Sequence, residues 1–120
     1  MIEQSVEPSG YQLATINHQL VLPHIHSGCE PVWHLFTIRH PQRDALQAKL
    51  TEAGVGTLIH YPVPPHLSGA YANPSWPRGK FRLAEQIADT ILSLPLGPHV
   101  TEAQAAYVVK TIRDADAALQ

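Results

Sequence analysis

The sequence has few of the features that mark a secreted, membrane-spanning or nucleic-acid-binding protein. Cys29 is the single cysteine among 120 residues, which excludes an internal disulfide and a cysteine-based metal site within one chain. The eight Lys and Arg residues are dispersed and the formal net charge is -2, which argues against binding to nucleic acid or an anionic membrane. Neither a signal peptide nor an apolar run near the roughly 20 residues of a membrane span is present. These absences predict one small cytoplasmic domain.

The pattern of apolar residues predicts a small α/β fold. Residues 1–18 are polar and without a regular period, so we expect a poorly structured leader before a domain at 19–120. Strand-like stretches lie at 19–25, 32–40, 55–61 and 93–96. Helical spacing is found at 41–53, 82–92 and 101–118. We therefore expect an α/β (α+β) fold with a small mixed or antiparallel sheet of three to four strands and about three helices.

The helix boundaries have clear local signals. Thr101 and Gln104 have the spacing of a capping box at the start of the last helix, and Gly54 can end the first one. Pro41 suits a first helical turn, where a missing N–H costs nothing. These local signals place the helices more firmly than the strands.

The most unusual stretch is the run HYPVPPH at 60–66, which follows the predicted strand at 55–61. Proline cannot donate to a sheet ladder, so the chain is expected to leave the sheet there. Because each proline has a fixed φ, His60, Tyr61 and His66 should be held at nearly constant positions. This segment is the first candidate for a binding site.

Other polar residues have a functional and a structural interpretation. His24 and His26 would share one face of a strand and could bind zinc with His34 or His18, but no carboxylate pattern accompanies them. We therefore favour a solvated surface for the pair and assign no metal site. His34 is expected to be a buried structural histidine in the middle of a strand.

Loop and helix residues further along the chain are also ambiguous. Glu85 and Asp89 are spaced by one helical turn and are expected to face water near the start of a helix. Tyr71 and Trp76 could stack on a ligand ring or cover the core. No residue pattern in the chain forms a self-contained catalytic unit.

The order of short motifs resembles the C-terminal small domain of the DegT/DnrJ/StrS family of nucleotide-sugar aminotransferases over about residues 20–118. The motifs that carry this resemblance are Val32-Trp33-His34-Leu35-Phe36, Gly54-Val55-Gly56, His60-Tyr61-Pro62, Pro65-His66-Leu67, Ala70-Tyr71, Ala84-Glu85 and Leu92-Ser93-Leu94-Pro95-Leu96. The resemblance implies a fold-type-I enzyme that uses pyridoxal phosphate, of which this chain would lack the large domain.

The resemblance also implies what this chain does and does not contribute. Lys49, Lys80 and Lys110 do not match the family's Schiff-base lysine motif, so no catalytic residue and no cofactor site are expected here. By the resemblance, four residues would line the sugar-nucleotide side of the cleft: His60, Tyr61, His66 and Tyr71.

Several functions remain open from the sequence. The first is a stand-alone or truncated small domain without transaminase activity, which self-associates as a symmetric dimer through apolar surface that lacks its usual cover. The second is a module that binds a nucleotide sugar through His60, Tyr61, His66 and Arg78. The third is one half of a split enzyme completed by a separate large domain, and the fourth is a piece of a longer enzyme.

Overall fold

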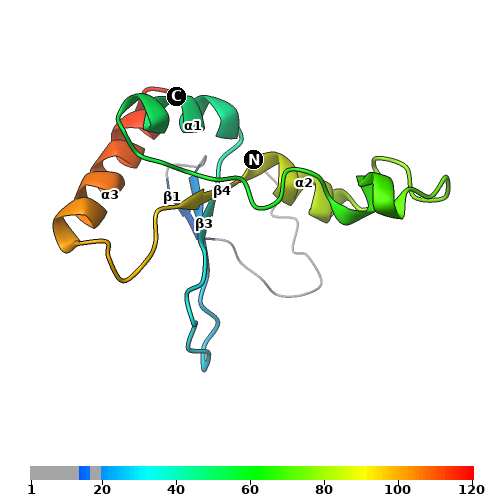
Figure 1. Ribbon diagram of the computed structural model, residues 1–120, viewed down its shortest axis with the longest axis horizontal. Helices are drawn as coiled ribbons and strands as arrows, with labels where there is room; N and C mark the ends of the chain where they lie inside the picture. The colour runs from blue at the N-terminus through cyan, green and yellow to red at the C-terminus, as the bar shows by residue number, and fades with distance from the viewer. Residues whose placement is uncertain (1–13, 17–19) are drawn as a thin grey trace, which may run out of the picture.

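The computed structural model describes residues 14–16 and 20–120, and its centre is a four-stranded antiparallel sheet in the order β1-β2-β3-β4 (Figure 1). The strands are β1 (Ala14–Ile16), β2 (Leu20–Leu22), β3 (Phe36–Arg39) and β4 (Ile91–Leu94). Strands β3 and β4 have four residue pairs in register, whereas the central strands β2 and β3 share only the pair Val21 and Arg39. The predicted fold class is confirmed.

Three helices accompany the sheet, namely α1 (Arg43–Glu52), α2 (Arg82–Thr90) and α3 (Glu102–Ala117). Two short 3₁₀ turns, η1 (Pro65–Leu67) and η2 (Gly69–Tyr71), lie in the loop before α2. Helices α1 and α3 pack against each other on the same side of the sheet, while α2 extends away from them (Figure 1). The predicted helix starts and ends are confirmed to within two residues.

The local capping signals explain these boundaries. The Thr101 side chain accepts from the Gln104 N–H, and the Gln104 side chain accepts from the Thr101 N–H, which completes the expected capping box. Gly54 follows α1 with a φ of +77°, a conformation in which any other residue would be strained.

The core lies between one face of the sheet and the two packed helices. One buried residue from each of β2, β3 and β4 points into it, namely Leu20, Ile38 and Leu92. Leu46 and Leu50 of α1 are fully buried in the same core cluster. Burial of each such side chain stabilises the fold by roughly 1.5–3 kcal/mol. The hydrophobic pattern of α1 therefore fixes which side of the sheet the helices cover.

A buried polar pair lies within this core. His40 follows β3, and its Nδ1 accepts a hydrogen bond from the Gln42 N–H at 2.9 Å. The proton must then be on Nε2, which donates to Asp116 Oδ1 at 3.1 Å. Because both side chains are almost fully buried, this hydrogen bond ties the end of α3 to the start of α1.

Several predicted strands are wrong. Among the described residues, 55–61 meets the sheet only through one bridge between Leu58 and Ser93, so it is not a strand. The prediction of a strand at 32–40 holds only from Phe36, because the preceding residues have no pairing partner there. The last strand begins earlier than predicted, at Ile91, where α2 has already ended.

The predicted leader at 1–18 lies mostly outside the described residues. Within it, Ala14–Ile16 forms β1 and pairs with β2, which the polar composition did not predict. A short strand can be stabilised by its neighbour's backbone without an apolar pattern of its own.

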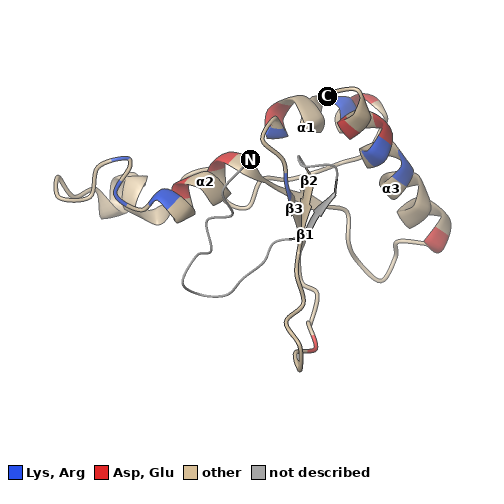
Figure 2. Cartoon of the chain, turned by 180° about the vertical axis from the view of Figure 1, so that it is seen from behind, with Lys and Arg blue, Asp and Glu red and all other residues tan. Residues whose placement is uncertain are grey.

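Two segments project from the packed body of the domain. The radius of gyration is 16.0 Å, compared with about 14 Å for a compact domain of this length. One projection is the 23–35 loop between β2 and β3, and the other is the arm, residues 61–90, which ends with α2 (Figure 1). Figure 2 shows that the 23–35 loop carries almost no charge. The exposed apolar side chains on the two projections include Ile25, Val32, Trp33, Tyr61, Val63, Tyr71, Trp76, Phe81 and Leu83.

Candidate functional site

The first part of the candidate site is His60, where the chain leaves the sheet. The segment crosses β4 once, through paired backbone hydrogen bonds of 2.7 and 3.1 Å between Leu58 and Ser93. The Ser93 hydroxyl, itself buried, lies 2.9 Å from His60 Nδ1 and hydrogen-bonds to it. The peptide bond between His60 and Tyr61 is cis. The edge of the Tyr61 ring meets His60 at a centroid distance of 5.7 Å, and this tyrosine is 75% exposed.

The second part is a buried hydrogen-bonded cluster that closes the loop before α2. Both carboxylate oxygens of Glu85 accept from the Gly79 N–H at 2.8 Å, and the Phe81 N–H adds a longer contact of 3.4 Å. His66 Nε2 lies 2.9 Å from Glu85 Oε1, and it must donate because an ionised carboxylate only accepts. Glu85 thus connects His66, early in the loop before α2, with Gly79, late in the same loop.

The charge state of Glu85 follows from these contacts. Burial raises the pKa of its carboxyl, but the hydrogen bonds from Gly79, His66 and Phe81 lower it by more, so the pKa lies below its ordinary value. The prediction that Glu85 faces water is wrong, because its side chain is buried. Its partner, His66, lies nineteen residues earlier in the chain, so local spacing did not reveal the contact. Asp89 does face solvent, 3.6 Å from Arg78.

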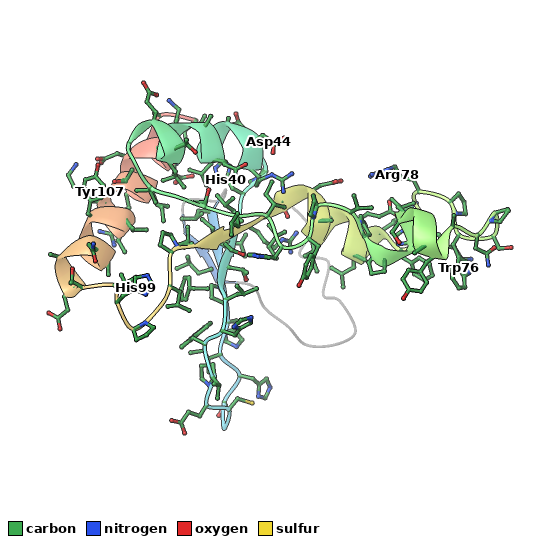
Figure 3. The ribbon with its side chains drawn as sticks, in the orientation of Figure 1. His40, Asp44, Trp76, Arg78, His99 and Tyr107 are labelled. Carbon is green, nitrogen blue, oxygen red and sulfur yellow. The ribbon has the colours of Figure 1, made fainter. Side chains whose placement is uncertain are left out.

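An aromatic hollow of about 210 Å³ lies beside this cluster and is lined by Pro65, His66, Tyr71, Trp76 and Phe81. Phe81 meets His66 and Trp76 edge to face, at centroid distances of 4.8 and 6.2 Å. Trp76 lies at the outer end of the arm (Figure 3). Such a set of ring faces and edges can stack on a planar ring.

The structure divides the four predicted binding residues between two places. His66 and Tyr71 share the aromatic hollow. His60 lines a second hollow, also about 210 Å³, together with His34 and Leu35 of the 23–35 loop. His34 is exposed there, so the prediction that it is a buried structural histidine is wrong.

Three residues of the site were not assigned a role from the sequence, namely Ser93, Glu85 and Gly79. Gly79 has a φ of +93°, which a residue with a side chain rarely adopts. The sequence feature that could have indicated this cluster is the glycine at position 79, in an irregular loop six residues before Glu85.

The other candidates remain at the surface. Among the residues that the structure describes, no three His, Cys, Asp or Glu side chains gather as a metal site. His24 and His26 are exposed, and His26 Nδ1 lies 2.9 Å from the Ser27 carbonyl, to which it donates. In the same described part of the chain, no helix is long and apolar enough to cross a membrane.

The surroundings of Lys49 and Lys110 do not fit a pyridoxal phosphate site. Lys110 pairs with Asp114 at 2.6 Å, and this contact raises its pKa, whereas a Schiff-base lysine needs a lowered one. Lys49 and Lys110 line a shallow hollow with the acidic residues Glu52 and Asp114, which would repel a phosphate.

The fold and site define a small α/β domain that presents a fixed histidine and tyrosine loop beside a sheet. The model of the DegT/DnrJ/EryC1/StrS aminotransferase family matches residues 10–113, and the chain belongs to this family. The resemblance noted from the sequence is thus confirmed.

Two of its relatives are named for erythromycin biosynthesis and for a dTDP-sugar transaminase. The erythromycin biosynthesis sensory transduction protein EryC1 of Saccharopolyspora erythraea is 49% identical over 94 residues, which are 78% of this chain and 26% of EryC1. The dTDP-3-amino-3,4,6-trideoxy-alpha-D-glucose transaminase of Streptomyces venezuelae is 49% identical over 85 residues, 71% of this chain and 22% of the enzyme.

Solved structures agree. The crystal structure of S. venezuelae DesV, in complex with a ketimine intermediate, superposes with a TM-score of 0.77 at 46% identity and covers 80% of this chain and 26% of DesV. An aminotransferase of the same family from Brucella abortus gives 0.72 at 31% identity over 81% of this chain and 26% of its own. The chain therefore spans about a quarter of the length of these relatives, in agreement with a partial domain.

Proposed function

We propose that this chain acts as the substrate-facing small domain of a nucleotide-sugar aminotransferase and has no transaminase activity by itself. The family membership supports the reaction class, and the transaminase name of a 49% identical relative supports a dTDP-linked sugar as the substrate class. Lys110 is engaged in a surface ion pair and Lys49 lies beside acidic residues, which supports an inactive isolated chain.

The observation that carries this proposal is the anchored loop from His60 to Tyr71. Ser93 holds His60 at the start of the loop, and Glu85 holds His66 in its middle, both through hydrogen bonds of 2.9 Å. Tyr61 and Tyr71 are 75% and 65% exposed on this fixed loop. Their rings can meet a base or sugar at little cost in ordering entropy. In this proposal Tyr61 and Tyr71 contact the ligand, while His66 holds the loop and His60 offers its remaining ring nitrogen.

The apolar projections require a covering surface. The 23–35 loop and the arm expose large apolar side chains, among them Val32 and Leu83, and contiguous surfaces of this kind usually meet another chain or domain. We expect a second copy or a separately folded large domain to cover them, in the cytoplasm, where the exposed Cys29 would remain reduced.

The binding test is an NMR titration of the chain with a dTDP-sugar. We expect localised amide shifts between His60 and Tyr71, and loss of those shifts in Y61A. The control is V109A, which removes a half-exposed apolar side chain on α3, away from the loop. Amides that stay unmoved at millimolar dTDP-sugar, or equal binding by Y61A and the unaltered chain, would contradict this assignment.

Two further measurements separate the possible partners. Sedimentation from low to high micromolar concentration should show a dimer if a second copy covers the projections, and a single monomer throughout would exclude that cover. Mixing the chain with a family large domain should restore transamination if the chain is one half of a split enzyme. An active isolated chain would contradict the proposal as a whole.

A further inference from the structure

A groove of about 540 Å³ lies between the start of α3, the loop after α1 and the loop after β4. Its walls are mostly apolar and include Val55, Pro95, Val100, Ala103 and Val108. Its size falls within the range of about 300–1,000 Å³ that is typical of small-molecule sites. His60, His66, Tyr61 and Tyr71 do not line it, although Gly56 and Pro95 also line the hollow beside His60.

One side of the groove is built from a nearly bare backbone. Gly54 needs to be glycine because its φ is +77°, but Gly56 has no such conformation, and a Cβ at Gly56 would meet open space. The fold of this chain therefore does not explain the glycine at position 56. Because glycine has no side chain, a flat ligand can approach the backbone closely at this position.

Two further ring side chains line the groove, and one of them is held in place by a hydrogen bond. The Tyr107 hydroxyl donates to the Ala53 carbonyl at 2.9 Å, which holds the ring across the gap between α3 and the loop after α1. The His99 ring lies so close to Gly97 that a Cβ there would stand 2.6 Å from it. Figure 3 places both rings on the side of the molecule that carries α3.

The polar groups of the groove are few. The Gln104 oxygen is used in the capping box, whereas no hydrogen bond within the described residues involves either ring nitrogen of His99. An imidazole at the edge of an otherwise apolar groove can bind one polar edge of a ligand.

We propose that this groove binds a neutral aromatic molecule of one or two fused rings. The ring would lie between the backbone at Gly56 and the Tyr107 ring, and a polar N–H or O–H at its edge would donate to His99. A planar neutral molecule is favoured over a branched or charged one for three reasons. The wall at Gly56 carries no side chain, the Tyr107 ring lines the groove, and His99 is the only ionisable group besides Tyr107 that lines it.

The test uses indole as the probe and the full chain as the protein. Indole should shift the amides of Val55, Val100 and Val108 in a saturable way. A103L places a larger side chain in the groove and should weaken binding by about tenfold or more. A106L makes the same change at an exposed position of α3 outside the groove and should leave the affinity unchanged.

The role of His99 is tested with 1-methylindole, which lacks the N–H donor. The unaltered chain should bind indole about three- to tenfold more tightly than 1-methylindole, and H99A should abolish this preference. G56A, at a site with room for a methyl group, should keep the fold and weaken indole binding. An equal effect of A103L and A106L, or an absence of localised shifts, would overturn the site. If the chain does not bind indole and A103L changes its sedimentation, the proposal is overturned, and the groove is instead covered by a second copy of the chain.

Discussion

The buried hydrogen bond between His40 and Asp116 makes a quantitative prediction. In D116A, the His40 Nε2–H remains in the core without its acceptor, which costs about 1–3 kcal/mol. The same change removes a carboxylate from the C-terminal end of α3, where it opposes the helix dipole, and inserts a better helix former. These two gains of a few tenths of a kcal/mol partly conceal the loss.

A matched variant removes this ambiguity. D114A makes the same substitution two residues earlier in α3, where the Asp114 side chain is 64% exposed. It shares the helix gains and breaks no buried hydrogen bond, but it removes the exposed ion pair with Lys110, which contributes little. We therefore expect D116A to be less stable than D114A by about 1–3 kcal/mol, with a Tm difference of roughly 3–6 °C per kcal/mol at this chain length.

The assay is reversible chemical and thermal unfolding followed by circular dichroism. D116N should recover most of the stability, because its side-chain carbonyl can still accept from His40 Nε2–H. Equal stability of D116A and D114A would show that the buried contact contributes nothing. A D116N variant as unstable as D116A would show that the contribution comes from the carboxylate charge instead of a hydrogen bond.

Two further predictions concern the core and the loop cluster. L46A removes a fully buried side chain of α1 and should lower the free energy of unfolding by about 2–5 kcal/mol, whereas L83A, at a 55% exposed position, should change it by less than about 1 kcal/mol, as denaturant titration would show. Because the pKa of Glu85 is lowered in the folded chain, its stabilising effect is complete above about pH 4.3 and is lost as the pH falls through the folded value. The Gly79 amide shift should therefore titrate below about pH 4.3 in the unaltered chain and not in E85Q; a higher midpoint would refute the lowered pKa.

The helices could be predicted from the sequence because their signals are local. The capping box at Thr101 and the glycine at position 54 act within a few residues of the boundaries they set. The strand at 55–61 could not be judged in this way, because a strand exists only where a neighbour pairs with it. Apolar alternation at 32–35 was equally misleading, since those residues project beyond the sheet.

The candidate site could be predicted only in part for the same reason. The proline-rich run identified His60, Tyr61 and His66, and the resemblance added Tyr71 to the binding residues. The groups that position the two histidines come later in the chain, from β4 and α2, and no local spacing links them. The spacing of Glu85 and Asp89 could not show that Glu85 is buried, because two acidic residues one helical turn apart have the same spacing when both face water.

The order of these contacts explains how a strand-like run can end in a fixed loop. The segment touches the sheet once, at Ser93, and the same serine holds His60 through its hydroxyl. The loop then depends on Glu85, which closes it from the start of α2. Both anchors are formed by residues that follow the loop, so it can become rigid only after α2 has formed and β4 has joined the sheet. The exposure of Tyr61 and Tyr71 is therefore imposed by folded structure on both sides, which is the arrangement expected of a surface that binds with little loss of entropy.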